Sequence, residues 1–235
     1  MKNTKFIKWE QNVLENLQNL KTKIDQNEQA KKLYGGFYIW DSKFIENPKI
    51  MFVGINPGNG NPNNNGSITI KPEEQMSYLE YLDGENSSDS LARETVETFE
   101  LSGYSRSEIR ELFNNKSIKT NLYYLITSNE NDIANCLNQV ENNGYDKYKV
   151  QSKNWTNDLI SIMKPKVLIC EGKSVFNHFK DNNIHTDYEW DNDCGSLKLN
   201  DETIVIGYSR RFSNIRNKSG LSKIINKYLP VNQVF

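Results

Sequence analysis

The sequence predicts an α/β protein, built as a three-layer α/β/α sandwich with a four-stranded parallel sheet at its centre. Two observations support this prediction. Four short, nearly all-apolar runs occur along the chain, and segments with helical periodicity separate them. Strands that alternate with helices favour a parallel sheet covered by helices on both faces. The length of 235 residues and the lack of an interdomain linker predict a single domain over 1–235.

The first half of the chain supplies an N-terminal helix and two of the strands. Apolar residues recur at steps of three and four, which predicts an amphipathic helix over most of 4–31, within a helical extension covering 1–35. Lys49 to Ile55 is a short apolar run typical of a buried strand. Residues 72–113 are predicted to form helices broken at two glycines, and Ile118 to Ile126 is the second predicted strand.

The second half repeats the alternation. A helix that contains Trp155 and Leu159 is expected to end before Pro165. Lys166 to Cys170 is the third predicted strand, and a helix opens at Gly172. Thr203 to Tyr208 is the fourth strand, and a final helix is predicted around 221–228.

Charge is unevenly distributed although the net charge is only −1. Residues 203–235 carry six Lys and Arg and no carboxylate, whereas residues 73–112 carry eleven carboxylates and three Arg. This asymmetry favours an electropositive face for a polyanion and a solvated acidic face elsewhere. The alternative is a basic C-terminal helix that is merely solvated.

Several classes of protein are excluded by composition. No run approaches the roughly 18 apolar residues that a membrane span needs. The first ten residues lack the apolar core of a secretion signal, so a cytoplasmic protein is expected. Three widely spaced cysteines without a CxxC pair argue against a disulfide framework and against a zinc or iron–sulfur site. No metal and no organic cofactor are expected.

Candidate site residues follow the predicted strands, because ligands of open parallel sheets bind outside the carboxyl ends of the strands. Asn56 stands between Gly54-Ile55 and Pro57-Gly58, where ordinary turn chemistry is the alternative explanation. Gly172, Lys173 and Ser174 begin a helix after a strand, so their backbone N–H groups could hold a phosphate. The alternative is that these three residues form only a tight strand-to-helix turn without a ligand. A dinucleotide fingerprint and a P-loop are both absent.

Three segments resemble the uracil-DNA glycosylase superfamily. Val53 to Gly58 (VGINPG) looks like the first motif of its mismatch-specific uracil/thymine branch. Lys119 to Leu125 (KTNLYYL) is similar to the strand that supplies the base-reading Asn. Met163 to Phe179 (MKPKVLICEGKSVFNHF) looks like the third strand, its Gly turn and the following helix. The order and spacing of the segments agree with the family over residues 45–228.

The resemblance implies a uracil-DNA glycosylase-like fold and an enzyme that flips a nucleotide and cleaves its N-glycosidic bond. Asn56 matches the residue that positions water, and Asn121 matches the residue that reads the base, with a strand-end cap as the alternative. Gly54, Ile55, Pro57 and Gly58 would line the base pocket. The remaining DNA contacts would come from Arg210, Arg211, Phe212, Arg216 and Lys218. The first three stand where the family inserts a wedge, with an exposed basic turn as the alternative.

The sequence departs from the family pattern at the fourth strand. The expected His-Pro-Ser-like triplet is absent, and the strand runs into Tyr208-Ser209-Arg210-Arg211. Either Ser209 replaces the histidine, or Asn217 serves from a longer loop. The aromatic residue that stacks on the base in the family is missing: either Tyr78 or Tyr81 replaces it, or the pocket is more open than usual. This departure and Gly58, which removes the wall against a 5-substituent, favour a base larger than uracil.

The expected protein is therefore a monomeric, monofunctional DNA glycosylase that acts on uracil or a 5-substituted pyrimidine and leaves an abasic site. Its role would be base repair or defence against phage DNA that contains modified cytosines. A catalytically silent DNA- or base-binding module is the first alternative. A hydrolase of small nucleotides is the second.

Overall fold

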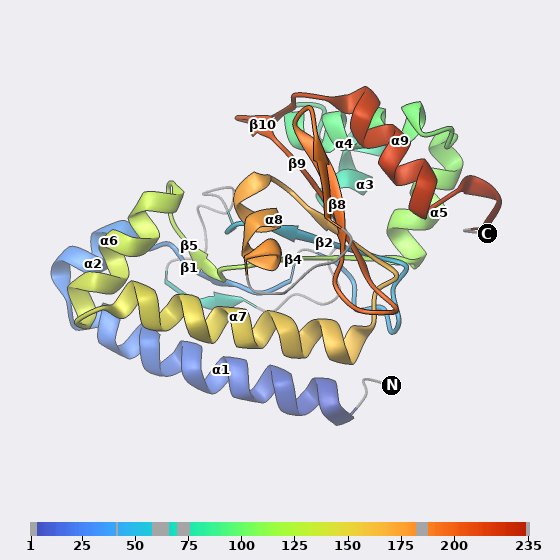
Figure 1. Ribbon diagram of the computed structural model, residues 1–235. Coiled ribbons are helices and arrows are strands. Elements are labelled where there is room, and N and C mark those ends of the chain that lie inside the picture. Colours follow the sequence, from blue (N-terminus) through green and yellow to red (C-terminus); the bar gives the residue numbers. More distant parts are fainter. Residues whose placement is uncertain (1–3, 41, 58–65, 70–75, 182–187, 234–235) are drawn as a thin grey trace. The chain divides into compact units, whose positions relative to one another are not determined.

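The computed structural model describes residues 4–40, 42–57, 66–69, 76–181 and 188–233 (Figure 1). The chain divides into two compact units that interleave in sequence. The helical unit comprises Met1–Trp40, Ile55–Lys71 and Asn121–Met163, and the sheet unit comprises Asp41–Gly54, Pro72–Thr120 and Lys164–Phe235. The expectation of a single domain over 1–235 stays a prediction.

The helical unit contains four helices and a small sheet among its described residues. The helices are α1 (Thr4–Asp25), α2 (Glu28–Leu33), α6 (Glu130–Val140) and α7 (Gly144–Met163). The strands are β1 (Gly36–Tyr38), β3 (Ile68–Thr69) and β5 (Leu125–Ile126). Strand β1 lies between the other two, parallel to β3 and antiparallel to β5.

The predicted amphipathic N-terminal helix is confirmed, but it is two helices rather than one. The predicted apolar stripe of α1 is buried except at Leu20, which is partly exposed. Helix α1 lies alongside α7, where Trp9 Nε1 donates a hydrogen bond of 2.9 Å to the Trp155 carbonyl (Figure 1). The break falls at Asn27, whose side chain accepts hydrogen bonds from the backbone of Gln29 and Ala30. An Asn in extended conformation is a preferred N-cap, so it starts a new helix.

The sheet unit is built on a six-stranded sheet in the order β4-β2-β6-β9-β8-β7. These strands are β2 (Ile50–Gly54), β4 (Ser117–Asn121), β6 (Val167–Cys170), β7 (Tyr188–Asp191), β8 (Cys194–Lys198) and β9 (Ile204–Tyr208). Strands β2, β6 and β9 are parallel, whereas β8 runs antiparallel to β7 and to β9. The sheet is therefore mixed.

The α/β class is confirmed, and three of the four predicted strands, β2, β6 and β9, are parallel to one another. The prediction of an all-parallel, four-stranded sheet is wrong, because the hairpin β7–β8 adds two strands and makes the sheet mixed. The hairpin β7–β8 was not predicted because β7 is mostly exposed and has no apolar run. Its turn is formed by Asn192 and Asp193, which both have positive φ, as two-residue hairpins require. The predicted strand from Ile118 to Ile126 also divides, because β4 ends at Asn121 and Leu125–Ile126 forms β5 of the other unit.

Helices cover both faces of the large sheet. They are α3 (Ser77–Leu82), α4 (Ser90–Leu101), α5 (Arg106–Asn115), α8 (Lys173–Lys180) and α9 (Lys218–Tyr228), followed by a 3-10 turn (Val231–Gln233). Ile206 of β9 belongs to the core that contains α4 and α9. A Cβ atom on the next residue, Gly207, would lie 2.4 Å from the Phe176 ring of α8. Because neighbouring strand residues face opposite sides, α8 covers the other face.

The helices predicted over 72–113 and their two breaks are confirmed from residue 76 onward, and residues 72–75 lie outside the described part of the chain. Asp89 caps α4 by accepting hydrogen bonds from the backbone of Leu91 and Ala92. Ser105 and Glu108 form a capping box at the start of α5. Among the helices in the described part of the chain, none has the length and apolar character needed to cross a membrane.

Tyr104 allows a prediction for alkaline pH. Its hydroxyl donates a 2.6 Å hydrogen bond to the Leu229 carbonyl, and burial, followed by the charge of Glu108, raises the pKa of Tyr104 from 10.0 to about 12. The unfolded chain ionises at the lower pKa, so the stability contributed by protonated Tyr104 is lost as the pH rises from 10 to about 12. Urea unfolding across this window should show a steeper loss for the native protein than for Tyr104→Phe. Identical slopes would contradict the prediction.

Candidate functional site

Asn56 lies in the loop that follows β2, and its side-chain amide is held in one orientation. Its Nδ2 donates hydrogen bonds of 3.2 Å to Thr127 Oγ1 and to the Pro57 carbonyl. Thr127 Oγ1 donates in turn to the Asn129 carbonyl at 2.8 Å, so its lone pairs are available to Asn56. No described residue donates a hydrogen bond to Asn56 Oδ1. A half-buried, oriented amide oxygen of this kind can accept a hydrogen bond from a water molecule.

Asn121 lies at the end of β4, and its loop is joined to that of Asn56. The Tyr123 backbone N–H donates a 2.9 Å hydrogen bond to the Ile55 carbonyl. Asn121 is only 6% exposed, and within the described parts of the chain no side chain or backbone group bonds its amide. The amide therefore retains a donor and an acceptor, the pair of functions that reads a base edge. The structure brings Asn121, Ile55, Asn56 and Pro57 into one pair of loops, whereas Gly58 lies outside the described residues.

The proposed stacking role of Tyr78 meets a geometric obstacle. Its ring is fully buried in the sheet unit, with its centroid 5.2 Å from that of Phe52 and 4.4 Å from Lys119 Nζ. The ring is thus part of the core, and Tyr81, which is half-buried, is the more accessible of the two tyrosines.

The Gly172 turn and Arg210 lie together in the sheet unit. Gly172 has φ +135° and is the N-cap of α8. A Cβ atom at this position would lie 3.5 Å from Arg210 Nε, so the guanidinium group stands beside the first turn of the helix. Lys173 and Ser174 in that turn are exposed. Backbone N–H groups at a helix start and an adjacent Arg side chain together suit a phosphate.

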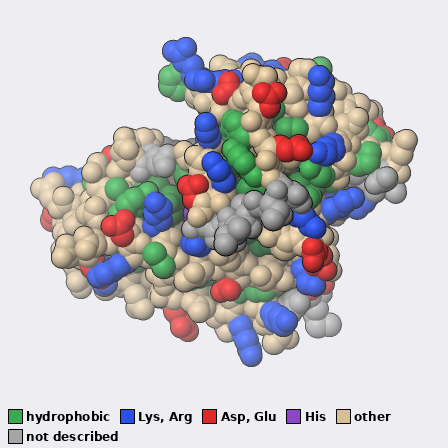
Figure 2. Space-filling view, viewed as in Figure 1, with side chains coloured by type: hydrophobic (Ala, Val, Ile, Leu, Met, Phe, Trp, Pro, Cys, Tyr) green, Lys and Arg blue, Asp and Glu red, His purple; other side chains and the backbone are tan. Residues whose placement is uncertain are grey.

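Phe212 lies at the tip of a short hairpin formed by β10 (Arg210–Arg211) and β11 (Asn214–Ile215). Its side chain is 86% exposed and its φ is +55°. The two-residue turn between the strands requires positive φ at its first residue, and this conformation costs a bulky residue such as Phe about 1–3 kcal/mol. Figure 2 shows basic side chains and a hydrophobic one projecting where β10 lies in Figure 1. The segment therefore presents an apolar tip flanked by Arg side chains.

Ser209 and Asn217, the two candidates for the missing histidine, have different surroundings. Ser209 is buried at the end of β9, where its N–H donates to the Asp193 carbonyl at 2.6 Å. Asn217 is the N-cap of α9: its Oδ1 accepts from the Gly220 N–H at 2.8 Å, and its Nδ2 donates to the Asn192 carbonyl at 2.6 Å. Both ends of the Asn217 amide are thus occupied by the protein's own backbone.

Replacement of Asn217 by alanine is expected to lower stability by about 1 kcal/mol, the usual cost of losing an N-cap. Asn217→Asp should restore only part of this loss, because its carboxylate accepts the same Gly220 N–H but has no donor for the Asn192 carbonyl. Thermal unfolding of the three proteins provides the measurement. A catalytic role for Asn217 would instead require a loss of base release that exceeds the loss of stability and that Asn217→Ser, another good cap, does not restore.

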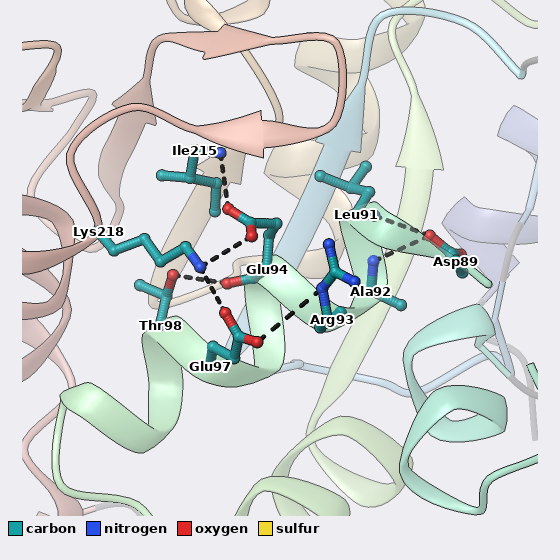
Figure 3. A network of polar contacts seen from close by, with 9 residues as sticks. All are labelled: Asp89, Leu91, Ala92, Arg93, Glu94, Glu97, Thr98, Ile215 and Lys218. Atoms are coloured by element: carbon teal, nitrogen blue, oxygen red, sulfur yellow. Dashed lines mark hydrogen bonds and ion pairs between the residues drawn. The ribbon is translucent and has the colours of Figure 1, made fainter. Parts of the chain in front are cut away.

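Two of the basic residues that the sequence predicts to contact DNA have carboxylate partners within the protein. Lys218 Nζ lies 2.8 Å from Glu94 Oε1 and also contacts Glu97 Oε2 (Figure 3). Arg216 Nη1 lies 3.8 Å from Asp193 Oδ1 and remains half-exposed. The expectation of a solvated acidic face over 73–112 is therefore wrong at Glu94, which is buried against the basic C-terminal segment.

The structure contains a buried polar cluster of Tyr78, Lys119 and Glu171 that the sequence did not predict. Tyr78 donates a hydrogen bond to Glu171 Oε1, and Lys119 Nζ lies 3.8 Å from the same oxygen. Lys119 belongs to β4 and Glu171 follows β6, so the cluster lies near the carboxyl ends of these strands. Glu171 in the sequence CEGK stands directly after a strand, but no local signal shows that a Lys 52 positions earlier meets it.

Comparison with models of protein families and with characterised proteins finds no match to this sequence. Within the described residues, no three His, Cys, Asp or Glu side chains gather in an arrangement that could hold a metal ion.

Proposed function

We propose that this protein is a monofunctional DNA glycosylase with a uracil-DNA glycosylase-like fold. It hydrolyses the N-glycosidic bond of uracil or a 5-substituted pyrimidine and leaves an abasic site. The observation that carries the proposal is the orientation of Asn56, whose Nδ2 is held by Thr127 while Oδ1 has no donor among the described residues. The sequence resemblance assigns this same residue to the positioning of water.

In the proposed reaction, water bonds to C1′ of the flipped nucleotide while the C1′–N1 bond breaks. The sugar gains positive charge, and the base departs as an anion that ends with the proton released by the water. An amide is too weak a base to remove this proton, so Asn56 acts by orienting the water. Asn121 supplies one donor and one acceptor to the base, which gives recognition and stabilises the departing charge.

The DNA contacts in this proposal come from the exposed tip of the sheet unit. Phe212 would fill the gap left by the flipped nucleotide, and Arg210 and Arg211 would hold phosphates. Such a contact favours a duplex over free nucleotides, which speaks against the small-nucleotide hydrolase. Gly58 and the buried position of Tyr78 suit a base larger than uracil. Base repair or defence against phage DNA with modified cytosines would use this activity.

A silent binding module is the second candidate, and one observation favours it. Ser209, at the position of the family's histidine, is 8% exposed, and neither Ser209 nor Asn217 offers an imidazole to the departing base. Such a module would retain the Arg-flanked Phe212 tip and would bind DNA without releasing a base.

The test is base release from duplexes that contain uracil, mispaired thymine, 5-hydroxymethylcytosine or its glucosylated form, with abasic sites counted after alkali cleavage. Release of one base is expected. Binding without release of any base would favour the silent module. Affinity that does not change with salt concentration would contradict a DNA-binding role for either candidate, because phosphate contacts displace counterions.

A further inference from the structure

The β10–β11 hairpin is too short to be stable without contacts to the rest of the sheet unit. It has two residue pairs, Arg210 with Ile215 and Arg211 with Asn214, and a turn of two residues. An isolated hairpin of this size is not stable in water. Its tip nevertheless places Phe212 at φ +55° with the ring in solvent. Contacts beyond these four residues therefore fix it: the Arg216 N–H donates a 3.1 Å hydrogen bond to the Ser209 carbonyl, and the Ile215 side chain is buried in the core of the sheet unit.

Glu94 on α4 adds a side-chain contact to the backbone of the hairpin. Its side chain is 8% exposed, and Oε2 accepts a 3.0 Å hydrogen bond from the Ile215 backbone N–H. The other oxygen, Oε1, lies 2.8 Å from Lys218 Nζ at the start of α9. Figure 3 shows the carboxylate between these two groups. One buried side chain thus binds the last residue of the hairpin and the first residue of the helix that follows it.

Glu97 lies three residues after Glu94 on α4, but it has no hydrogen bond to the hairpin in the described part of the chain. It contacts Lys218, and its Oε1 lies 3.9 Å from Arg93 Nε. The Glu97 side chain is half-exposed. Glu97 therefore shares the cation of Glu94 without sharing its contact to Ile215.

We propose that Glu94 is a positioning residue: it holds the β10–β11 hairpin so that Phe212 and its flanking Arg side chains meet DNA already in place. The part that concerns DNA rests on the proposed function. A preformed tip avoids ordering this loop during binding, which would otherwise weaken the complex. Lys218, although basic, is paired with Glu94 and Glu97, which neutralise the charge that a phosphate would need.

The chemistry of Glu94 distinguishes its two contacts. An amide oxygen can accept the Ile215 N–H, so Glu94→Gln keeps this hydrogen bond and loses the charge and the acceptor opposite Lys218, which Glu97 still contacts. Glu94→Ala loses both and leaves a buried N–H without its partner. Glu97→Ala removes a charge from Lys218 and leaves the hairpin contact intact. The three variants therefore separate the hydrogen bond from the ion pair.

The first experiment needs no DNA: it measures hydrogen exchange at the Ile215 amide. We expect exchange in Glu94→Ala to be faster by about tenfold or more, as suits a lost hydrogen bond to a charged acceptor. Glu94→Gln should recover most of the protection, and Glu97→Ala should match the native protein. Native-like exchange in Glu94→Ala, or faster exchange in Glu97→Ala, would overturn the proposal. If Glu94→Ala does not fold, loss of protection at Ile215 in Glu94→Gln would overturn it, because the Gln side-chain oxygen can still accept the Ile215 N–H.

The second experiment combines Glu94→Ala with Phe212→Ala and measures base release. If Glu94 acts through the hairpin tip, its replacement slows release in the native background and adds little once Phe212 is gone. Losses that simply multiply would overturn the link to Phe212. If the native protein releases no base, the proposed function fails, whereas the exchange comparison still decides whether Glu94 holds the hairpin.

Discussion

Asn56→Ala is expected to lose base release by roughly 10²-fold or more, the scale on which misplacement of a reacting group slows an enzyme. DNA affinity should change little, because the Phe212 tip and the Gly172 turn are untouched. Single-turnover release and binding of the same duplex, measured for native and variant protein, provide the comparison. A native rate of release in Asn56→Ala would mean that Asn56 is only a turn residue.

Thr127 supplies a graded control for this prediction. Thr127→Val removes the oxygen that accepts from Asn56 Nδ2 but leaves the amide in the chain. The loss of one hydrogen bond of about 1 kcal/mol should slow release roughly fivefold. Thr127→Ser keeps the oxygen and should restore the rate. If all three Thr127 proteins released base equally while Asn56→Ala did not, the orientation of the amide would be unimportant and its mere presence sufficient.

The sequence predicted the buried strands well because their burial leaves a local signal. Strands β2 and β6 are buried throughout, and they coincide with short apolar runs. Strand β7 has the opposite pattern, since it is mostly exposed and pairs on one side with β8. Its existence depends on the turn at Asn192 and Asp193, which a search for apolar runs does not detect.

The partners of charged residues could not be predicted from the sequence, because they are remote along the chain. Glu94 and Lys218 are 124 positions apart, and each stands in a segment whose composition suggests solvation. Asn217 shows the same limit on a smaller scale. A loop Asn can cap a helix or serve a reaction, and only the distances to Gly220 and Asn192 reveal the cap.

The second large effect is expected at Lys119 and Glu171, whose side chains are 10% and 5% exposed. Lys119→Met removes the cation and leaves Glu171 buried with Tyr78 as its hydrogen-bond donor. Removal of one member of a buried pair typically costs 3–5 kcal/mol, so we expect a loss of about 4 kcal/mol in the free energy of unfolding. Urea unfolding followed by circular dichroism gives this value.

The exposed pair of Lys227 and Glu189, whose Nζ and Oε2 atoms are 3.4 Å apart, is the matched control for burial. Lys227→Met should lower the free energy of unfolding by about 0–1 kcal/mol, because water solvates the carboxylate that remains. For the buried pair, Lys119→Met combined with Glu171→Gln should cost less than the sum of the single changes, since no uncompensated charge is then left. Burial, followed by the charge of Glu171, raises the pKa of Tyr78, so the Tyr78 hydroxyl stays protonated and can donate to the side chain at position 171. Strictly additive losses would show that Lys119 and Glu171 do not interact, and the cluster would then be held by Tyr78 alone.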